Sequence, residues 1–150
     1  DEVERRGLDL FMAEREPRSG QFGGDCFHCH GGALFTDHGF RNNGLPLDPA
    51  DPGRAKVTGS SLDEGAFVTP SLRNVALTAP YMHDGRFATL EEVLDHYSEG
   101  VARTATLDPN LAKHPDGGLG LTKEEKSALA AFLRALTDDR FAQDAFRDGG

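Results

Sequence analysis

The sequence predicts a mostly α-helical domain in which long, irregular loops connect a few amphipathic helices. Three stretches place apolar residues at helical spacing, at residues 2–15, 90–98 and 123–136. Between them lie stretches rich in glycine, proline and aspartate, and no run alternates apolar and polar residues as a strand would. A C-x-x-C-H motif follows the first helical stretch. We expect one domain, with its core over residues 2–137 and a loose tail at 138–150.

The first helical stretch is amphipathic. Val3, Gly7, Leu10 and Phe11 recur at helical spacing, and charged residues fill the other faces. Pro17 ends the stretch, because proline has no amide hydrogen and does not continue a helix. We therefore expect a helix that packs one face on the core directly before the C-x-x-C-H motif.

The middle of the chain predicts loops. Residues 31–68 lack sustained periodicity, and a run of this length in a compact domain is uncommon unless it has a function. Wrapping a bound cofactor would be such a function for this loop. Thr69 and Pro70 then resemble an N-cap followed by proline at the first helical position, which predicts a short helix through Asn74.

Two capping boxes mark the later helices. Thr89 is followed three residues later by Glu92, and Thr122 is followed by Glu125. The first box opens the stretch at 90–98. The second opens the last helix, whose apolar face carries four residues: Leu129, Phe132, Leu133 and Leu136.

A loop over residues 101–120 separates these two helices. After the last helix, Phe141 and Phe146 are the aromatic residues that could anchor the tail. We expect the tail to contribute little to the core.

Cys26, Cys29 and His30 form the C-x-x-C-H motif that attaches c-type haem. Each thiol can bond one vinyl group of the same haem, and the histidine then becomes the proximal ligand of the iron. Zinc and a redox dithiol are the alternatives. The chain has 2 cysteines in all, whereas structural zinc sites usually use two ligand pairs. A disulfide between these two would close a very small loop and stabilise little. The motif therefore predicts one covalent haem c.

The net charge and the search for targeting segments indicate which partners and which compartment to expect. The net charge of −9 argues against nucleic acid as a partner and favours a basic redox partner. No stretch is long or apolar enough to insert in a membrane. The chain begins at Asp1 without a signal peptide, which fits a processed protein or a fragment of a longer one. Covalent haem attachment is extracytoplasmic in bacteria, so the motif predicts a periplasmic protein.

The distal side of the haem decides its chemistry, since the iron has either a sixth ligand or an open site. Four downstream residues are candidate ligands: Met82, His83, His96 and Tyr97. Tyr97 continues the apolar stripe of its helix, and Met82 would give the ligand pair of ordinary His/Met cytochromes. A tyrosine on a helix face usually belongs to the core, and a lone methionine is usually packing. The residues alone leave both open.

The run FVTPSLRNVALTAPYMHDG at residues 67–85 resembles the C-terminal haem domain of bacterial dihaem cytochrome c peroxidases, and it is also similar to the MauG enzymes. With the haem motif, Asn43-Gly44, and the segments at 51–54 and 90–100, the resemblance covers most of residues 7–136. It implies a cytochrome c-like helical domain with long haem-wrapping loops.

The resemblance also implies site residues. In the peroxidases, a methionine on the helix after His-Asp-Gly ligates this haem, whereas the MauG type has a tyrosine there. The matching residue is Tyr97, so the resemblance favours His30 and Tyr97 over His30 and Met82. It also implies a calcium ion between two domains, with the backbone carbonyls of Thr78 and Pro80 among its ligands. A third ligand belongs to the N-terminal domain of those proteins.

The function implied by the resemblance is electron transfer within a peroxidase-type oxidoreductase. In the peroxidases the N-terminal haem meets hydrogen peroxide and the C-terminal haem relays or stores electrons. This chain has one haem motif and resembles the relay half, so we expect a second haem domain or a redox protein as its partner. The alternative is a stand-alone, one-haem electron carrier with His30/Met82 ligation.

Overall fold

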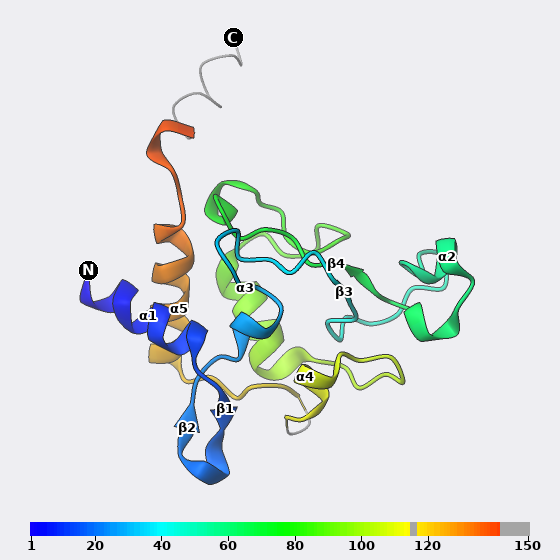
Figure 1. Ribbon diagram of the computed structural model, residues 1–150, viewed down its shortest axis with the longest axis horizontal. Helices are drawn as coiled ribbons and strands as arrows, with labels where there is room; N and C mark the ends of the chain where they lie inside the picture. The colour runs from blue at the N-terminus through cyan, green and yellow to red at the C-terminus, as the bar shows by residue number, and fades with distance from the viewer. Residues whose placement is uncertain (115–116, 142–150) are drawn as a thin grey trace.

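The structure, a computed structural model, describes residues 1–114 and 117–141, and it is rich in helix with a few very short strands (Figure 1). The predicted tail from residue 142 onward, including Phe146, lies outside the described residues. The α-helices are α1 (Glu2–Met12), α2 (Ala55–Thr58), α3 (Leu90–Asp95), α4 (Pro109–Ala112) and α5 (Lys123–Ala135). A π-helical turn, η5 (His96–Gly100), continues α3. The 3-10 turns are η1 (Pro17–Ser19), η2 (Cys26–His28), η3 (Ser61–Asp63) and η4 (Val75–Leu77).

Two small antiparallel pairs of strands hold loops together. Strand β1 (Arg15–Glu16) pairs with β2 (Gln21–Phe22), and β3 (Phe40–Arg41) pairs with β4 (Phe67–Val68). Each strand has two residues, too few to produce an alternating pattern in the sequence, so the sequence analysis did not predict them. Within the described residues, no helix is long and apolar enough to cross a membrane.

Helices α1 and α5 lie side by side at the left of the view in Figure 1. Gly7 is buried where they meet. A Cβ atom added there would overlap the carbonyl oxygen of Ala128 and the Cβ of Phe132. The two helices can therefore pack this closely only because α1 presents a glycine.

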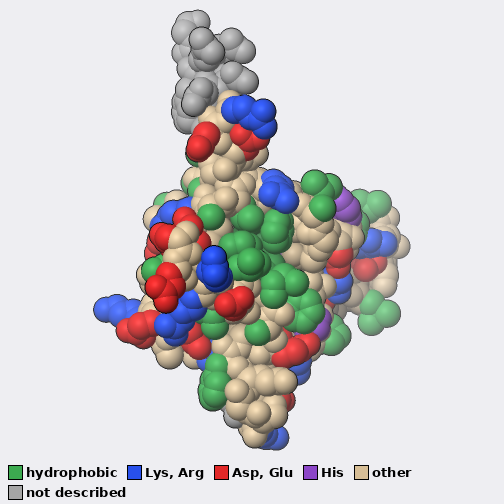
Figure 2. Space-filling view, turned by 60° about the vertical axis from the view of Figure 1, so that its left-hand side comes forward, with side chains coloured by type: hydrophobic (Ala, Val, Ile, Leu, Met, Phe, Trp, Pro, Cys, Tyr) green, Lys and Arg blue, Asp and Glu red, His purple; other side chains and the backbone are tan. Residues whose placement is uncertain are grey.

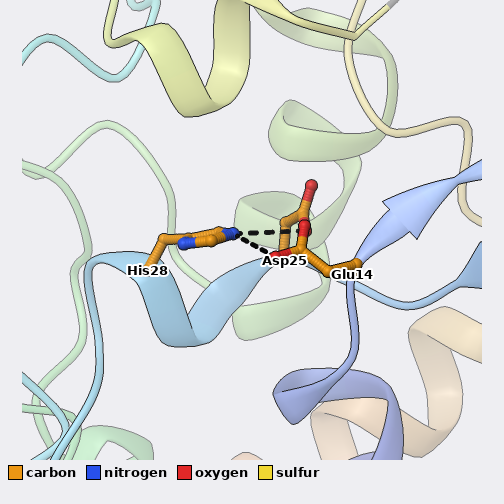
Figure 3. Close-up of side chains that lie close together, drawn as sticks. All are labelled: Glu14, Asp25 and His28. Atoms are coloured by element: carbon orange, nitrogen blue, oxygen red, sulfur yellow. Dashed lines mark ion pairs between the residues drawn. The ribbon is translucent and has the colours of Figure 1, made fainter.

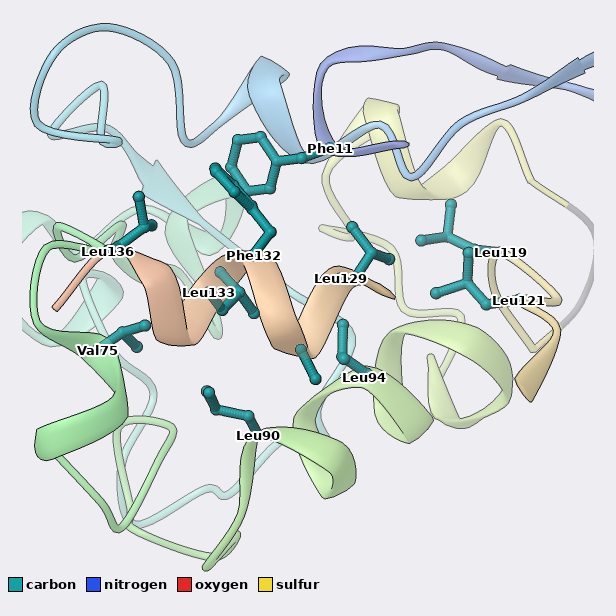
Figure 4. Close-up of a cluster of buried hydrophobic side chains, with 11 residues drawn as sticks. Phe11, Val75, Leu90, Leu94, Leu119, Leu121, Leu129, Phe132, Leu133 and Leu136 are labelled. Carbon is teal, nitrogen blue, oxygen red and sulfur yellow. The ribbon is translucent and has the colours of Figure 1, made fainter. Parts of the chain in front are cut away.

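A cluster of buried apolar side chains joins α1 and α5 to α3 (Figure 4). The rings of Phe11 and Phe132 pack 5.2 Å apart between their centroids. Phe11 and Leu129 are each 1% exposed, which makes them the largest fully buried side chains among the described residues. The apolar face predicted for the last helix is therefore confirmed as core. Of the face predicted for the first helix, Gly7 and Phe11 are buried, whereas Val3 is exposed.

Both predicted capping boxes are present. The Thr89 hydroxyl accepts from the Glu92 amide, and the Thr122 hydroxyl accepts from the Glu125 amide, each at 3.2 Å. The helix after Thr89 ends as α-helix at Asp95, however, and residues beyond it form the π-helical turn. The helix expected to about residue 98 is therefore present, and its last turn has π-helical hydrogen bonding.

The predicted helix at residues 69–74 was wrong. Instead of helical bonds, this segment makes hydrogen bonds to the loop after the C-x-x-C-H motif. Ser71 Oγ donates to the carbonyl of Leu34 at 2.6 Å, and Arg73 Nη2 donates to the carbonyl of Ala33 at 2.8 Å. These contacts between distant parts of the chain outweigh the local helix signal, and only the short turn η4 follows.

The core allows a direct stability prediction. We expect Phe11→Ala to lower the free energy of unfolding by about 3–5 kcal/mol, because it leaves a cavity between α1 and α5. Val57→Ala is the matched control: Val57 is 89% exposed on α2, and we expect its truncation to change stability by less than about 0.5 kcal/mol. Denaturant titration followed by circular dichroism measures both. Equal losses in the two variants would contradict the placement of Phe11 in the core.

Candidate haem site

The C-x-x-C-H motif forms a tight turn against α1. The amides of Cys29 and His30 both donate to the Cys26 carbonyl, at 3.3 and 3.0 Å. Both thiols are free and half-buried. Burial raises the pKa of Cys26 to about 12 and that of Cys29 to about 11, so both are protonated at neutral pH. The turn thus gathers two thiols and an imidazole within five consecutive residues.

The ring of His30 is oriented by the loop that follows it. His30 Nδ1 lies 3.1 Å from the carbonyl oxygen of Phe35. Phe35 has a left-handed backbone conformation (φ 52°), and its amide donates to the Gly32 carbonyl at 3.1 Å. Since a carbonyl accepts only from N–H, the proton of the neutral ring lies on Nδ1. With the proton on Nδ1, Nε2 carries the lone pair that can bind a metal. The ring also has a hydrogen bond with the backbone of Pro70.

Tyr97 lies on the π-helical turn η5 and belongs to the same site. It is half-buried, and burial raises the pKa of its hydroxyl to about 12. A hydrogen bond with the Asn43 side chain lowers this pKa, and the charges of Cys29 and Cys26 raise it. Tyr97 and Cys26 both pack against the same cluster of buried apolar side chains. Turns of π-helix often occur at functional sites, because they shift a side chain out of α-helical register.

Met82 contacts the side chain of Asn43. Asn43 Nδ2 donates to Met82 Sδ at 3.4 Å. The two histidines that the sequence offered as ligands have other contacts: His96 Nε2 lies 3.0 Å from the carbonyl oxygen of Asn43, and the exposed His83 stacks on Phe67 with ring centroids 3.6 Å apart. The structure thus places Met82 against the side chain of Asn43, whereas His96 contacts the backbone of Asn43 and His83 contacts Phe67.

Half-buried apolar side chains surround these donors. They pack against the core beside Cys26 and Tyr97, and they include Leu10, Phe27, Phe35, Leu72 and Tyr81. Figure 2 shows hydrophobic side chains gathered in a continuous patch on one face of the molecule. Two thiols, an imidazole, a phenol and partly buried apolar side chains are a set of groups that fits a covalently attached haem. Thr78 and Pro80, the residues of the expected calcium site, are exposed on the segment after η4.

A cluster of ion pairs around the buried Asp25 lies at the start of the C-x-x-C-H turn (Figure 3). Glu14, Asp25 and His28 have donor atoms within 4.8 Å of one another, as a metal site would require. The chain supplies its own cation, however: Lys113 Nζ lies 3.0 Å from Asp25 Oδ2 and 3.1 Å from Glu14 Oε2. His114 Nε2 is 2.7 Å from the same Asp25 oxygen. The cluster therefore ties η2 to the segment after α4.

Sequence reasoning missed this cluster and the position of Asn43. Lys113 and Asp25 are far apart in the chain, and no motif joins them. One feature of the sequence could have pointed to Asp25, which directly precedes the motif. The structure gives it a left-handed conformation (φ 55°), which aspartate and asparagine tolerate.

The cluster predicts a loss of stability in Asp25→Asn. Asparagine keeps the left-handed backbone and the acceptor for the Arg15 amide (2.9 Å), but it removes the charge that faces Lys113. We expect a loss of about 2 kcal/mol, the usual size for a hydrogen bond to a charged group. Asp95→Asn is the control, because its pair with Lys126 is exposed and should contribute less than about 1 kcal/mol. Thermal unfolding compares the two, and equal effects would contradict a structural role for Asp25.

Comparison with known proteins identifies relatives of the chain, although no family model matches it. Cytochrome-c peroxidase IdrP2 of Denitromonas iodatirespirans is 33% identical over 144 residues, covering 77% of this chain and 37% of that protein. The methylamine utilization protein MauG of Methylophilus methylotrophus is 34% identical over 135 residues, covering 90% of this chain and 37% of that protein.

Solved structures give the same result. A MauG-like protein associated with microbial copper homeostasis superposes with a TM-score of 0.74 at 39% identity, over 93% of this chain and 45% of that one. The diheme peroxidase BthA of Burkholderia thailandensis superposes with a TM-score of 0.69 at 26% identity, over 93% of this chain and 43% of BthA. The chain thus spans less than half the length of these relatives. By sequence and by fold, it belongs with the bacterial cytochrome-c peroxidases and MauG proteins.

Proposed function

We propose that Cys26 and Cys29 attach one c-type haem and that His30 is its proximal ligand. The observation that carries this proposal is the turn itself, which presents both thiols beside an imidazole whose Nδ1 is held by the Phe35 carbonyl. The homology to cytochrome-c peroxidases and MauG supports a c-type haem independently. When bound, the haem supplies one-electron redox chemistry. The loop at residues 31–36, clamped by Ser71 and Arg73, would wrap the histidine side.

Tyr97 is the distal ligand in this proposal, and Met82 is the alternative. Tyr97 is supported because it packs against the same buried cluster as Cys26. A phenolate is a hard, anionic donor that favours the higher oxidation states of iron, whereas a thioether favours the ferrous state and raises the potential. Ligation by Tyr97 would therefore suit a haem that stores oxidising equivalents.

The domain acts, in our proposal, as an electron relay for peroxide-dependent oxidation in a periplasmic oxidoreductase. Relatives with the names cytochrome-c peroxidase and diheme peroxidase support the reaction class, and a second haem domain or a redox protein would be the partner. A partner with a basic face would complement the net charge of −9. The exposed segment with Thr78 and Pro80 would add a calcium ion where the two domains meet.

Oxidation by peroxide tests the relay role. The fully reduced, full-length protein that contains this domain is mixed with one equivalent of hydrogen peroxide in a stopped-flow spectrometer. We expect the haem on Cys26 and Cys29 to become oxidised as fast as peroxide disappears, because it supplies an electron. If this haem stays reduced while peroxide is consumed, the relay role is wrong. A haem that exchanges electrons with a donor protein and shows no response to peroxide would favour the electron-carrier alternative.

A further inference from the structure

Residues 69–73 hold the loop that follows the C-x-x-C-H turn. Arg73 donates from both Nε and Nη2 to the carbonyl oxygen of Ala33, at 3.1 and 2.8 Å. Ser71 Oγ donates to the next carbonyl of the loop, that of Leu34, at 2.6 Å. The Arg73 amide in turn donates to Ser71 Oγ at 3.2 Å, which holds the two donors relative to each other. Two consecutive carbonyl groups of the loop are therefore fixed by two side chains of one distant segment.

Phe35, the residue after these two carbonyl groups, has a backbone conformation that needs such support. It is left-handed (φ 52°), which is strained for a bulky residue and persists only where the surrounding contacts hold it. Its ring packs against the rings of Phe11 and Phe132, with centroids 5.8 and 5.9 Å away. The guanidinium carbon of Arg73 lies 5.0 Å from the centroid of the Phe35 ring. Arg73 thus contacts this loop twice, at a carbonyl and at an aromatic ring.

The carbonyl of Phe35 is the group that orients the proximal histidine. Its oxygen lies 3.1 Å from His30 Nδ1. An acceptor on the outer nitrogen of a metal-binding histidine fixes the orientation of the ring and makes the other nitrogen a stronger donor to the metal. The position of this oxygen follows from the backbone of Phe35. That backbone is in turn held by the hydrogen bonds from Ser71 and Arg73 to the two residues before it.

We propose that Ser71 and Arg73 are positioning residues that set the orientation of the iron ligand His30. They do so by holding the Phe35 carbonyl against Nδ1–H, and this inference rests on the haem site proposed above. When either donor is missing, the loop opens more often, and Nδ1–H is without its acceptor for a larger share of the time. Nε2 is then a weaker donor, which stabilises ferric iron less and raises the reduction potential.

The test compares Ser71→Ala and Arg73→Gln with the wild type in the haem-loaded protein. Proton NMR of the ferric form follows the His30 Nδ1–H, whose signal is shifted by the iron, and measures how fast this proton exchanges with solvent. We expect exchange to be roughly fivefold faster in Ser71→Ala, the usual effect of one lost hydrogen bond, and faster still in Arg73→Gln, which loses two. A redox titration should give Ser71→Ala a higher reduction potential than the wild type.

Two controls separate positioning from other effects of these substitutions. Ser71→Thr keeps the hydroxyl, so it should keep the exchange rate and the potential of the wild type. Arg134→Gln removes the same charge as Arg73→Gln, but from an exposed ion pair with Glu91. Loss of a positive charge by itself lowers the potential, because it favours the more positive ferric iron. We therefore expect a higher potential in Arg73→Gln than in Arg134→Gln.

Failure of this inference is distinguishable from failure of the proposed haem site. If the wild type shows no iron-shifted signals of a histidine ring, His30 is not the ligand, and the inference falls with the site. If these signals are present but Ser71→Ala and Arg73→Gln keep the wild-type exchange rate and potential, His30 is the ligand and the two residues do not position it. Lower stability without these changes would show a structural role alone and would also contradict the inference. Because the variants remove different donors, failure of one to fold leaves the other to decide.

Discussion

Replacing Tyr97 with phenylalanine should remove the tyrosinate-to-iron band of the ferric protein completely and raise its reduction potential. A phenolate binds ferric iron more strongly than ferrous iron, since it is hard and anionic. If this preference is at least tenfold, its loss raises the potential by at least about 59 mV for a one-electron couple. The ferric absorption spectrum and a redox titration measure the two effects.

Tyr81→Phe is the matched control, because the chain has 2 tyrosines and Tyr81 is the other one. The Tyr81 hydroxyl donates to the Val75 carbonyl at 3.0 Å, and burial raises its pKa. This phenol has a partner outside the donor set, so we expect its removal to leave both the band and the potential unchanged. An identical response of the two variants would show that the band does not report on Tyr97 in particular.

Replacing Gly7 with alanine should lower the free energy of unfolding by about 3 kcal/mol or more. Alanine normally favours an α-helix over glycine by about 1 kcal/mol, so helix propensity alone predicts the opposite sign. The loss comes from the added methyl group, which overlaps the carbonyl oxygen of Ala128 and forces α1 and α5 apart. Urea or guanidinium titration measures it.

The control for Gly7 lies on the same helix. Val3 is 50% exposed, and Val3→Ala should change the free energy of unfolding by about 0.5 kcal/mol. A stabilised Gly7→Ala variant would mean that α1 and α5 are not in close contact at this point.

The sequence predicted those parts of the fold that are determined by residues close to one another in the chain. The boxes at Thr89 and Thr122 are complete within four residues, so the starts of α3 and α5 were predicted correctly. The segment at 69–74 was not, since its hydrogen bonds go to Leu34 and Ala33. The π-helical turn after α3 has no sequence pattern of its own.

The residues of the candidate haem site divide in the same way, into those that a local motif predicts and those that only the folded chain brings together. Cys26, Cys29 and His30 are adjacent and form a motif, so the sequence alone pointed to them. Tyr97 required a resemblance to a family, because a tyrosine on an apolar stripe is ordinary core. The contact of Asn43 with Met82 depends on the folded chain, and no spacing in the sequence predicts it.

The measurement that tests the central claim most directly is a haem assay on the unfolded protein. The purified protein is denatured, extracted with acidic organic solvent and examined by the pyridine haemochrome spectrum and intact mass. We predict one haem that stays on the polypeptide through two thioether bonds and is lost in the double variant Cys26→Ser/Cys29→Ser. A colourless wild-type protein, with Cys26 and Cys29 both open to a thiol-labelling reagent after unfolding, would contradict the account.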